Sequence, residues 1–482
     1  GFAELAANAT WFKNAYTIYD STERAQPAIM DGDLPSKDRQ PISSDHPNSI
    51  FSLFAKTHRL NVSEEATTVC SRDLCKDVRL DESYGSRISS MAEDLGLVWL
   101  HVVSPPHIEN DLASVSENWG NFGGSGDAEP ISQQTEQLDT RANLNGGRPL
   151  RFQEWIDRIV PGRRPALNFK HTLLPHVPWQ YLPSGTRYRR VPNDVIPGLS
   201  NQSFQDQGQL DVLLQRHFLQ TEFADLQLQH LWKQLKSEGL WDDSLIVVAA
   251  DHGVAFPHKR ERRLLTRENA AEIAPVPLFV KAPGQNKGKV DGAWVETIDI
   301  LPTIFDLLNL DPRVKMDGRS AFSHEVQNRD ELRILIRDTF EVLRIPAADF
   351  TRERRAIIDR NQRLFGSGAD GAGRIYEIGP NPELIGQPAS AAGEELDVNL
   401  SYAREYERVD PRSGYVPVHV VGRVNGPDRH PRDIAVAVNG TIRAVGNTFT
   451  LAVGDEGELV SVMVPDSAFR KGRNRVQVFA TP

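Results

Sequence analysis

The chain has 482 residues, with 55 Lys and Arg against 65 Asp and Glu, which gives a net charge of −10. At roughly 100–200 residues per domain, this length predicts two to four domains, or one large domain with an appendage. The acidic balance argues against a nucleic-acid-binding protein, which typically carries a basic face. No run of residues approaches the ~18 consecutive apolar positions of a membrane span.

The first part of the chain predicts helices followed by strands. Residues 2–16 begin with a helical pattern and continue into a strand, and residues 50–62 repeat that order. Residues 96–105 form a continuous apolar run between Gly and Pro, which is typical of a buried parallel strand. The polar, Gly-containing stretch over residues 109–148 predicts a long surface loop.

The middle of the chain continues the alternation. Helices are expected at 152–160, 209–239 and 296–310, and strands at 165–175, 244–250 and 275–284. This order predicts an α/β catalytic domain over residues 1–394, with a mostly parallel sheet flanked by helices. In such folds ligands bind beyond the carboxyl ends of the strands, so residues that directly follow strands are the first candidates for chemistry.

The pattern changes after about residue 395. Short alternating segments such as YVPVHVVGRV and DIAVAVNGTIRAV predict a small β-rich domain over residues 395–482, and Asn439–Gly440 is a hairpin-turn dipeptide. Carbohydrate binding, partner binding and covering of a sheet edge all remain open as roles for this region.

Cys70 and Cys75 are the only cysteines. A C-x4-C pair is too few ligands for a structural zinc site, which takes four. Two interpretations remain: a small-loop disulfide formed in an oxidising compartment, or two buried thiols.

Two segments carry candidate nucleophiles and metal ligands. Asp251, His252 and Gly253 follow the strongest predicted strand; a carboxylate beside an imidazole suits Zn²⁺ or Mn²⁺, although a capping Asp with a chance His fits equally. Ser21 and Thr22 precede a predicted helix, where backbone N–H groups favour anions; an ordinary helix cap is the alternative.

Two further segments could bind an anionic substrate. His171 and His176 lie in the Pro-rich stretch KHTLLPHVPWQYLPSG. Either histidine could donate to an oxyanion or a leaving group, or the stretch could be a rigid structural loop. The charge run HKRERR begins at His258 and Lys259; such runs usually form a solvated face, and this one could also line an anionic pocket.

Together these segments resemble the sulfatase and alkaline-phosphatase superfamily over about residues 2–320. The resemblance is carried by F-x-N-A-Y at 12–16, a nucleophile position eight residues after Asn14, a Gly ten residues further on, P-H-x-P at 175–178, D-H-G at 251–253, and the later TIDILPTIFDLL and MDGRS. It implies that Thr22 is the nucleophile, that His176 is catalytic, and that His171 binds substrate; the two histidines either bind the non-bridging oxygens or assist the leaving group.

Departures from the pattern indicate the branch. Sulfatases carry Cys or Ser at the nucleophile position, which is oxidised to formylglycine, and Thr22 cannot form that aldehyde. Arg24 and Gln26 replace the family's Pro and Arg. A Thr nucleophile is similar to the phosphotransfer branches, closest to the lipoteichoic-acid synthases, and implies action on phosphate esters of an envelope lipid or glycan, with Arg24, His258 and Lys259 binding the anionic group.

The resemblance also implies one divalent metal ion (Mn, Zn or Ca). None of the 13 His follows an Asp by four residues, the spacing of a second zinc site in the family. The expected ligands are Thr22, Asp251 and His252, plus a carboxylate from a first strand that we expect to precede Gly1. The metal site of the given chain is therefore expected to be incomplete.

The same branch implies an extracytoplasmic location in the cell envelope. The abrupt start of the chain leads us to expect a fragment whose membrane anchor precedes Gly1. Two other functions stay open: hydrolysis of sulfate esters without formylglycine, and a catalytically silent scaffold that binds an anionic glycan or lipid head group.

Overall fold

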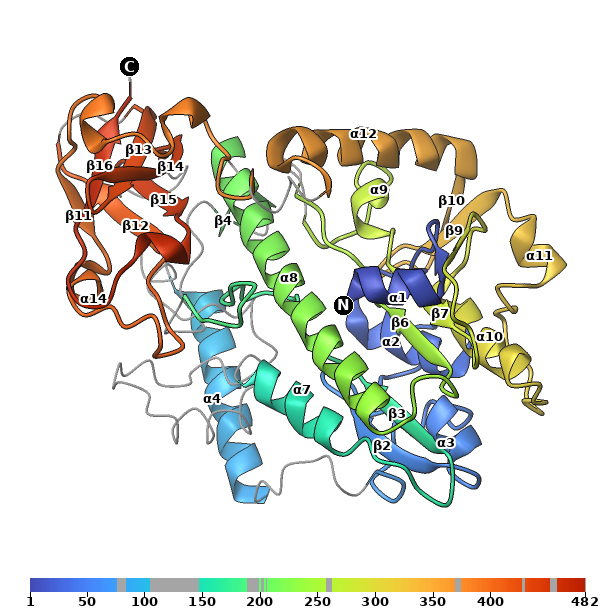
Figure 1. Ribbon diagram of the computed structural model, residues 1–482. Coiled ribbons are helices and arrows are strands. Elements are labelled where there is room, and N and C mark those ends of the chain that lie inside the picture. The colour runs from blue at the N-terminus through green and yellow to red at the C-terminus, as the bar shows by residue number, and fades with distance from the viewer. Residues whose placement is uncertain are drawn as a thin grey trace.

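A computed structural model describes residues 1–75, 84–104, 147–188, 199–200, 203–204, 206–256, 262–368, 374–426, 430–450 and 457–481. It contains an α/β body and a β-rich C-terminal region (Figure 1). Across these residues, no helix combines the length and apolar character that a membrane crossing requires.

The α/β body is built on a mixed sheet in the order β6-β7-β1-β8. Its strands are β1 (Thr10–Phe12), β6 (Ile246–Ala249), β7 (Leu278–Lys281) and β8 (Lys289–Asp291). β1 and β8 are parallel, whereas β7 is antiparallel to both β1 and β6. Three of the four strands therefore run in one direction. The α/β prediction is confirmed, and the reversed β7 makes the sheet mixed.

A second, parallel pair consists of β2 (Arg59–Ser63) and β3 (Ala166–Lys170). Both strands fall where the sequence predicts them. Glu65 follows β2 and His171 follows β3, just as Asp251 and His252 follow β6. The ends of these strands therefore set the position of the candidate site.

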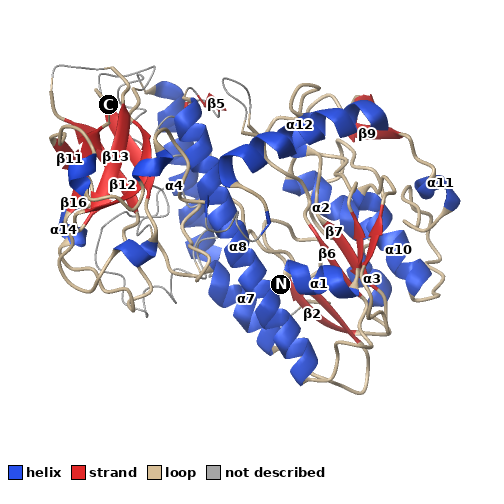
Figure 2. Ribbon diagram, turned by 45° about the horizontal axis from the view of Figure 1, so that its top comes forward, coloured by secondary structure: helices blue, strands red, loops and turns tan. Residues whose placement is uncertain are grey.

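Helices surround this body (Figures 1 and 2). Those described before the C-terminal region are α1 (Phe2–Asn8), α2 (Thr22–Asp31), α3 (Ile50–Phe54), α4 (Tyr84–Val103), α7 (Arg148–Asp157), α8 (Gln207–Ser237), α9 (Ala270–Ile273), α10 (Ile300–Leu307), α11 (His324–Gln327) and α12 (Ala347–Phe365). The long α8 confirms the helix expected at 209–239. Its apolar side chains Leu228 and Trp232 pack with Trp155 of α7 and Leu5 of α1.

The strand expected at 96–105 is wrong, because Gly96–Val103 belongs to helix α4. Met91, Leu95, Val98 and Val102 recur at helical spacing and are exposed. A short continuous apolar run is compatible with a buried strand or with a helix, and the flanking sequence determines which of the two forms. Of the loop expected at 109–148, residues 109–146 lie outside the described residues, and α7 already begins at Arg148.

The C-terminal region is β-rich, as predicted. It holds two three-stranded sheets, β11-β12-β15 and β14-β13-β16. Their strands are β11 (Val398–Leu400), β12 (His419–Val424), β13 (Asp433–Val438), β14 (Thr441–Asn447), β15 (Leu459–Met463) and β16 (Val476–Ala480). Asn439 and Gly440, with φ of 53° and 83°, form the turn between β13 and β14.

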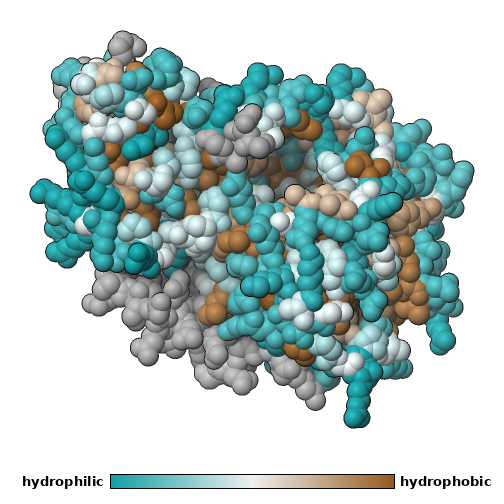
Figure 3. Space-filling model, in the orientation of Figure 1, coloured by the Kyte–Doolittle hydropathy of each residue, from teal (hydrophilic) through white to brown (hydrophobic). Residues whose placement is uncertain are grey.

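This region packs against α8 and residues 177–188 through one continuous apolar core (Figure 2). Val418 and Val436 of the β-rich region share that core with Trp179 and Leu213. The visible face of the molecule is otherwise largely hydrophilic (Figure 3). A domain boundary at residue 394 stays a prediction, since the two parts share a core.

Cys70 and Cys75 form a disulfide, as the first of the two interpretations predicts. The bridge joins residues only five positions apart, so by loop-closure entropy it contributes roughly 2 kcal/mol to the free energy of unfolding. We expect dithiothreitol to lower the unfolding free energy by about that amount in chemical denaturation. A Cys70→Ser/Cys75→Ser variant is the control, and its stability should not change on reduction.

Candidate active site

Thr22 is the first residue of α2 and lies at its buried N-terminus. Ser21 precedes it in an extended conformation, and the Thr22 side chain is 3% exposed. The helix ends at Gly32, which adopts a left-handed conformation (φ 74°) that favours glycine. The first N–H groups of a helix have no partner within it and form its positive dipole end, so this position stabilises negative charge on a hydroxyl or a bound anion.

His252 directly faces Thr22. Its Nδ1 lies 2.8 Å from the carbonyl oxygen of Gly253; because a carbonyl only accepts, Nδ1 must be the protonated nitrogen. The Nε2 atom therefore carries a lone pair, and it lies 3.3 Å from Thr22 Oγ1. Gly253 is required here, since a Cβ would come within 2.8 Å of the Ile273 carbonyl oxygen.

Asp251 supplies a carboxylate beside this pair. Its Oδ1 accepts the main-chain N–H of His252 at 2.9 Å, while Oδ2 is buried with no hydrogen-bond partner among the described residues. Burial alone would raise the pKa of this carboxyl, but positive charge on His252 and His171 when they are protonated, together with the Thr22 hydroxyl, lowers the pKa to about 2. Asp251 is therefore ionised at neutral pH, and its Oδ2 accepts no hydrogen bond from the described residues.

These three donors fit a small divalent cation. Oδ2 of Asp251 lies 3.8 Å from Nε2 of His252, which lies 3.3 Å from Thr22 Oγ1. Two ligands each about 2.1 Å from a tetrahedral ion lie about 3.4 Å apart, close to both separations. Within the described ranges, no group of three or more His, Cys, Asp or Glu side chains is arranged to hold an ion; the set consists of one carboxylate, one imidazole and one hydroxyl.

His171 follows β3 and is held by the residues around Glu65. Its Nδ1 donates to the Glu65 carbonyl oxygen, which leaves Nε2 with a lone pair. The Glu65 carboxylate accepts from Lys170 Nζ at 2.6 Å. Protonation of His171 would help to lower the pKa of Asp251.

Both ring nitrogens of His176 are engaged. Nδ1 donates to the Val177 carbonyl oxygen at 2.6 Å, and Nε2 lies 3.1 Å from Nη1 of Arg263, from which it must accept. Burial, followed by the charges of Arg263 and Arg148, holds the pKa of His176 well below its usual range. His176 is therefore a neutral acceptor in this arrangement.

The loop that carries His176 is fixed by two buried side chains. Arg148, fully buried, donates to the carbonyl oxygens of His176 at 2.6 Å and Val177 at 2.8 Å. Gln220 of α8 donates to the same His176 carbonyl at 2.9 Å. Sequence reasoning missed both, because neither stands near a recognisable motif.

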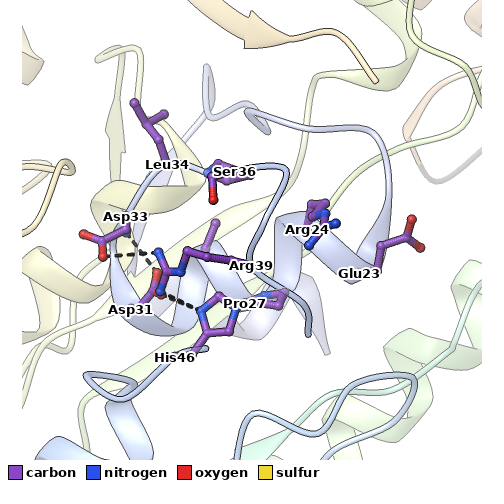
Figure 4. A pocket seen from close by; sticks show the side chains of 11 residues that line it. Glu23, Arg24, Pro27, Asp31, Asp33, Leu34, Ser36, Arg39 and His46 are labelled. Carbon is purple, nitrogen blue, oxygen red and sulfur yellow. Dashed lines mark hydrogen bonds and ion pairs between the residues drawn. The ribbon is translucent and has the colours of Figure 1, made fainter. Parts of the chain in front are cut away.

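Arg24 is not brought to Thr22. Two positions along a helix turn the chain by about 200°, and Arg24 instead lines a small pocket with Asp31, Arg39 and His46 (Figure 4). One of its nitrogens, Nη2, donates to the Lys37 carbonyl oxygen at 3.2 Å. His258 and Lys259 lie outside the described residues.

Arg263, the last residue of the charge run, is the cation that the sequence analysis missed. The charges of Asp251, Glu23 and Asp20 raise its pKa, but burial, the larger effect, and Arg337 lower it. The charge run HKRERR was the only feature of the sequence that pointed to Arg263, and nothing in the run distinguishes Arg263 from the other basic residues.

Comparison with known proteins finds a family model that resembles part of this site. Residues 151–310 match the family model described as Sulfatase. This third of the chain is therefore similar to the sulfatase family. The matched residues include both predicted histidines of the Pro-rich stretch and the Asp251–His252 pair, whereas Thr22 precedes them.

The chain is also similar to parts of curated proteins. It is 30% identical over 122 residues to lipoteichoic acid synthase 1 of Bacillus subtilis, covering 24% of this chain and 19% of that protein. It is 35% identical over 103 residues to the multifunctional alkaline phosphatase superfamily protein PehA of Trinickia caryophylli, covering 21% and 19%. The matched part thus spans about a fifth of these relatives.

Solved structures give a broader match. The phosphonate monoester hydrolase SpPMH from Silicibacter pomeroyi aligns with 75% of this chain and 90% of its own, at 15% identity and a TM-score of 0.41.

Proposed function

We propose that this protein is a metal-dependent hydrolase or transferase that acts on phosphate esters, with Thr22 as the nucleophile. One observation carries the proposal: Thr22 Oγ1 stands at a helix N-terminus, 3.3 Å from the lone-pair nitrogen of His252. Asp251, with a buried and unpartnered oxygen, lies beside them. A buried hydroxyl in such surroundings is set up for activation.

The chain's own residues supply most of the chemistry. Asp251, His252 and Thr22 would hold the divalent ion, which when bound lowers the pKa of a coordinated hydroxyl. The Thr22 hydroxyl loses its proton to solvent, its oxygen forms a bond to phosphorus, and the bond between phosphorus and the ester oxygen breaks. The leaving oxygen takes a proton from solvent, and a phospho-Thr remains. Water or an acceptor hydroxyl then takes the phosphoryl group. The N-terminus of α2 and nearby cations stabilise the charge of the phosphoryl oxygens.

Phosphate rather than sulfate is favoured by the nucleophile, because Thr22 cannot become the aldehyde that formylglycine sulfatases use. The names of two relatives agree with this choice, since one is a lipoteichoic acid synthase and the other a multifunctional alkaline phosphatase superfamily protein. By the same likeness we propose an envelope lipid or glycan as substrate, an extracytoplasmic location and a membrane anchor in the complete protein.

A substrate panel tests this function. The protein is incubated with 4-nitrophenyl phosphate, bis-(4-nitrophenyl) phosphate and 4-nitrophenyl sulfate, each with Mn²⁺, Zn²⁺ or Ca²⁺. We expect release of nitrophenol from a phosphate ester and, after an acid quench, a phosphoryl adduct on the peptide that contains Thr22. Turnover of the sulfate alone would instead support a sulfatase. Binding of phosphate without any turnover would support a silent scaffold.

A further inference from the structure

We propose that Arg263 is the residue that binds the oxyanion of the ester, and that His176 is a positioning residue that holds the Arg263 guanidinium in place. This proposal rests on the proposed function of the same site. It differs from the sequence-based expectation that His176 itself performs a catalytic step.

The hydrogen bonds of His176 define its role. Nδ1 is committed to the Val177 carbonyl at 2.6 Å, so Nε2 has only a lone pair to offer. Arg263 Nη1 occupies that lone pair at 3.1 Å. A histidine bonded in this way has no proton available at Nε2 for a leaving group, but it fixes the plane of the guanidinium that it contacts.

The imidazole is itself held firmly. Arg148 and Gln220 donate to the His176 carbonyl oxygen at 2.6 and 2.9 Å. Trp179 Nε1 donates to the Pro175 carbonyl oxygen at 3.0 Å. The Arg148 guanidinium and the indole of Trp179 are almost fully buried, so the loop offers Arg263 a fixed acceptor.

A second set of contacts ties Arg263 to the nucleophile. Asp20, which is fully buried, precedes Ser21 and Thr22. Its Oδ2 accepts the Leu265 N–H at 2.6 Å, and its Oδ1 accepts from Arg337 Nε at 2.9 Å. Arg337 also donates to the Arg263 carbonyl oxygen at 3.4 Å. The turn before Thr22 and the segment 263–265 are therefore joined through one carboxylate.

The guanidinium keeps binding capacity for a substrate. Arginine has five N–H donors, and among the described residues its side chain makes one hydrogen bond, to His176. It is close enough to Asp251 and Glu23 for their charges to act on it. A planar fork whose described side-chain contact is His176 alone, on a segment tied to the turn before Thr22, suits two non-bridging oxygens of a tetrahedral phosphate or sulfate group.

Anion binding is measured first in a Thr22→Ala background, where turnover cannot interfere. Inorganic phosphate is titrated calorimetrically into this protein and into versions that also carry Arg263→Met, Arg263→Lys or His176→Gln. We expect Arg263→Met to weaken phosphate binding by at least about 30-fold and Arg263→Lys by less, since Lys keeps the charge but loses the fork. Gln at position 176 can still accept from Arg263 and should cost little.

Arg267→Met is the matched control, because Arg267 pairs with the partly exposed Glu353. It should leave phosphate binding unchanged, and thermal denaturation checks that every variant is folded. Unchanged binding in folded Arg263→Met would overturn the assignment of Arg263. These measurements do not depend on the identity of the nucleophile, so failure of the proposed function would leave them interpretable.

Varying the leaving group distinguishes a positioning role of His176 from a role as general acid. With Thr22 intact, rates are measured for aryl phosphates whose phenols differ in acidity. For a positioning residue, His176→Gln lowers all rates by a similar factor, and the slope against phenol pKa stays unchanged. A general acid would show a steeper slope in the variant, with selective loss on poorly acidic phenols, and that result would contradict the proposal.

Discussion

Replacing Thr22 with alanine is expected to lower kcat toward phosphate esters by roughly 10⁴- to 10⁶-fold, the range seen when a catalytic nucleophile is removed. The variant loses the oxygen that bonds to phosphorus, so no covalent intermediate can form. Its stability should change little, because the Thr22 hydroxyl lies 3.3 Å from His252 Nε2, a long hydrogen bond. Steady-state rates and a denaturation curve on the same preparation measure both quantities.

Ser21→Ala provides a matched control for this prediction. Ser21 is the neighbouring hydroxyl, equally buried at 3% exposure, and its Oγ has no hydrogen-bond partner among the described residues. We expect near wild-type activity from Ser21→Ala and reduced but measurable activity from Thr22→Ser, which keeps a hydroxyl. If Thr22→Ala retained a tenth of the wild-type activity, Thr22 would not be the nucleophile. The same would follow if Ser21→Ala lowered kcat by the factor expected for Thr22→Ala.

The meeting of Thr22 with His252 could be predicted from the sequence, although 230 residues separate them. The reason is architectural: the apolar strand β6 ends at Ala249, two residues before Asp251, and α2 begins at Thr22 after the connection that follows β1. Residues that follow strands of one sheet converge at one edge. The resemblance to the sulfatase and alkaline-phosphatase superfamily supplied the pairing, and the place of these residues after strands agrees with it.

The contacts that orient the site could not be predicted in this way. Whether His176 donates or accepts at Nε2 depends on which carbonyl lies beside Nδ1, and that is set by the loop conformation. Arg148, Gln220 and Asp20 act through main-chain atoms far away in the sequence. Such pairings leave no local pattern, because any long polar side chain at the right distance could make them.

The misassigned strand at 96–105 has a related cause. The apolar composition of residues 96–105 is that of a buried strand, but the helix that contains most of them begins at Tyr84, twelve residues before the apolar run. Periodicity in a short apolar run does not separate the two states. Context over a longer window decides, and here that context is helical.

Glu65→Gln is expected to destabilise the fold by about 3–5 kcal/mol, because it removes the charge that compensates a buried lysine. Glu65 is 4% exposed, and its Oε1 lies 2.6 Å from Lys170 Nζ and 3.3 Å from Arg151 Nε. Burial raises the pKa of the Glu65 carboxyl, but these two cations outweigh it and lower the pKa to about 2. Burial lowers the pKa of Lys170, whereas the Glu65 carboxylate raises it. The charged form of Lys170 therefore depends on Glu65.

Two controls define the cause of the loss. Glu353→Gln breaks a bidentate pair with Arg267 that is partly exposed, and it should cost less than about 1 kcal/mol. Glu65→Leu combined with Lys170→Met removes both buried charges and should recover much of the stability. A double variant as unstable as Glu65→Gln would show that the loss comes from packing rather than from an unpaired charge.

The stability difference between wild type and Glu65→Gln should also depend on pH, with a definite sign. The folded-state pKa of Glu65, about 2, lies below its ordinary value of 4.5. A carboxyl with a lowered folded pKa contributes its full stability above the unfolded pKa and loses that contribution as the pH falls toward the folded pKa. Denaturation between pH 7 and 3 should therefore give a constant difference above about pH 5 that shrinks below it. A difference that grew on acidification would contradict an ionised Glu65, and with it the support that the Glu65 segment gives to His171 in the candidate active site.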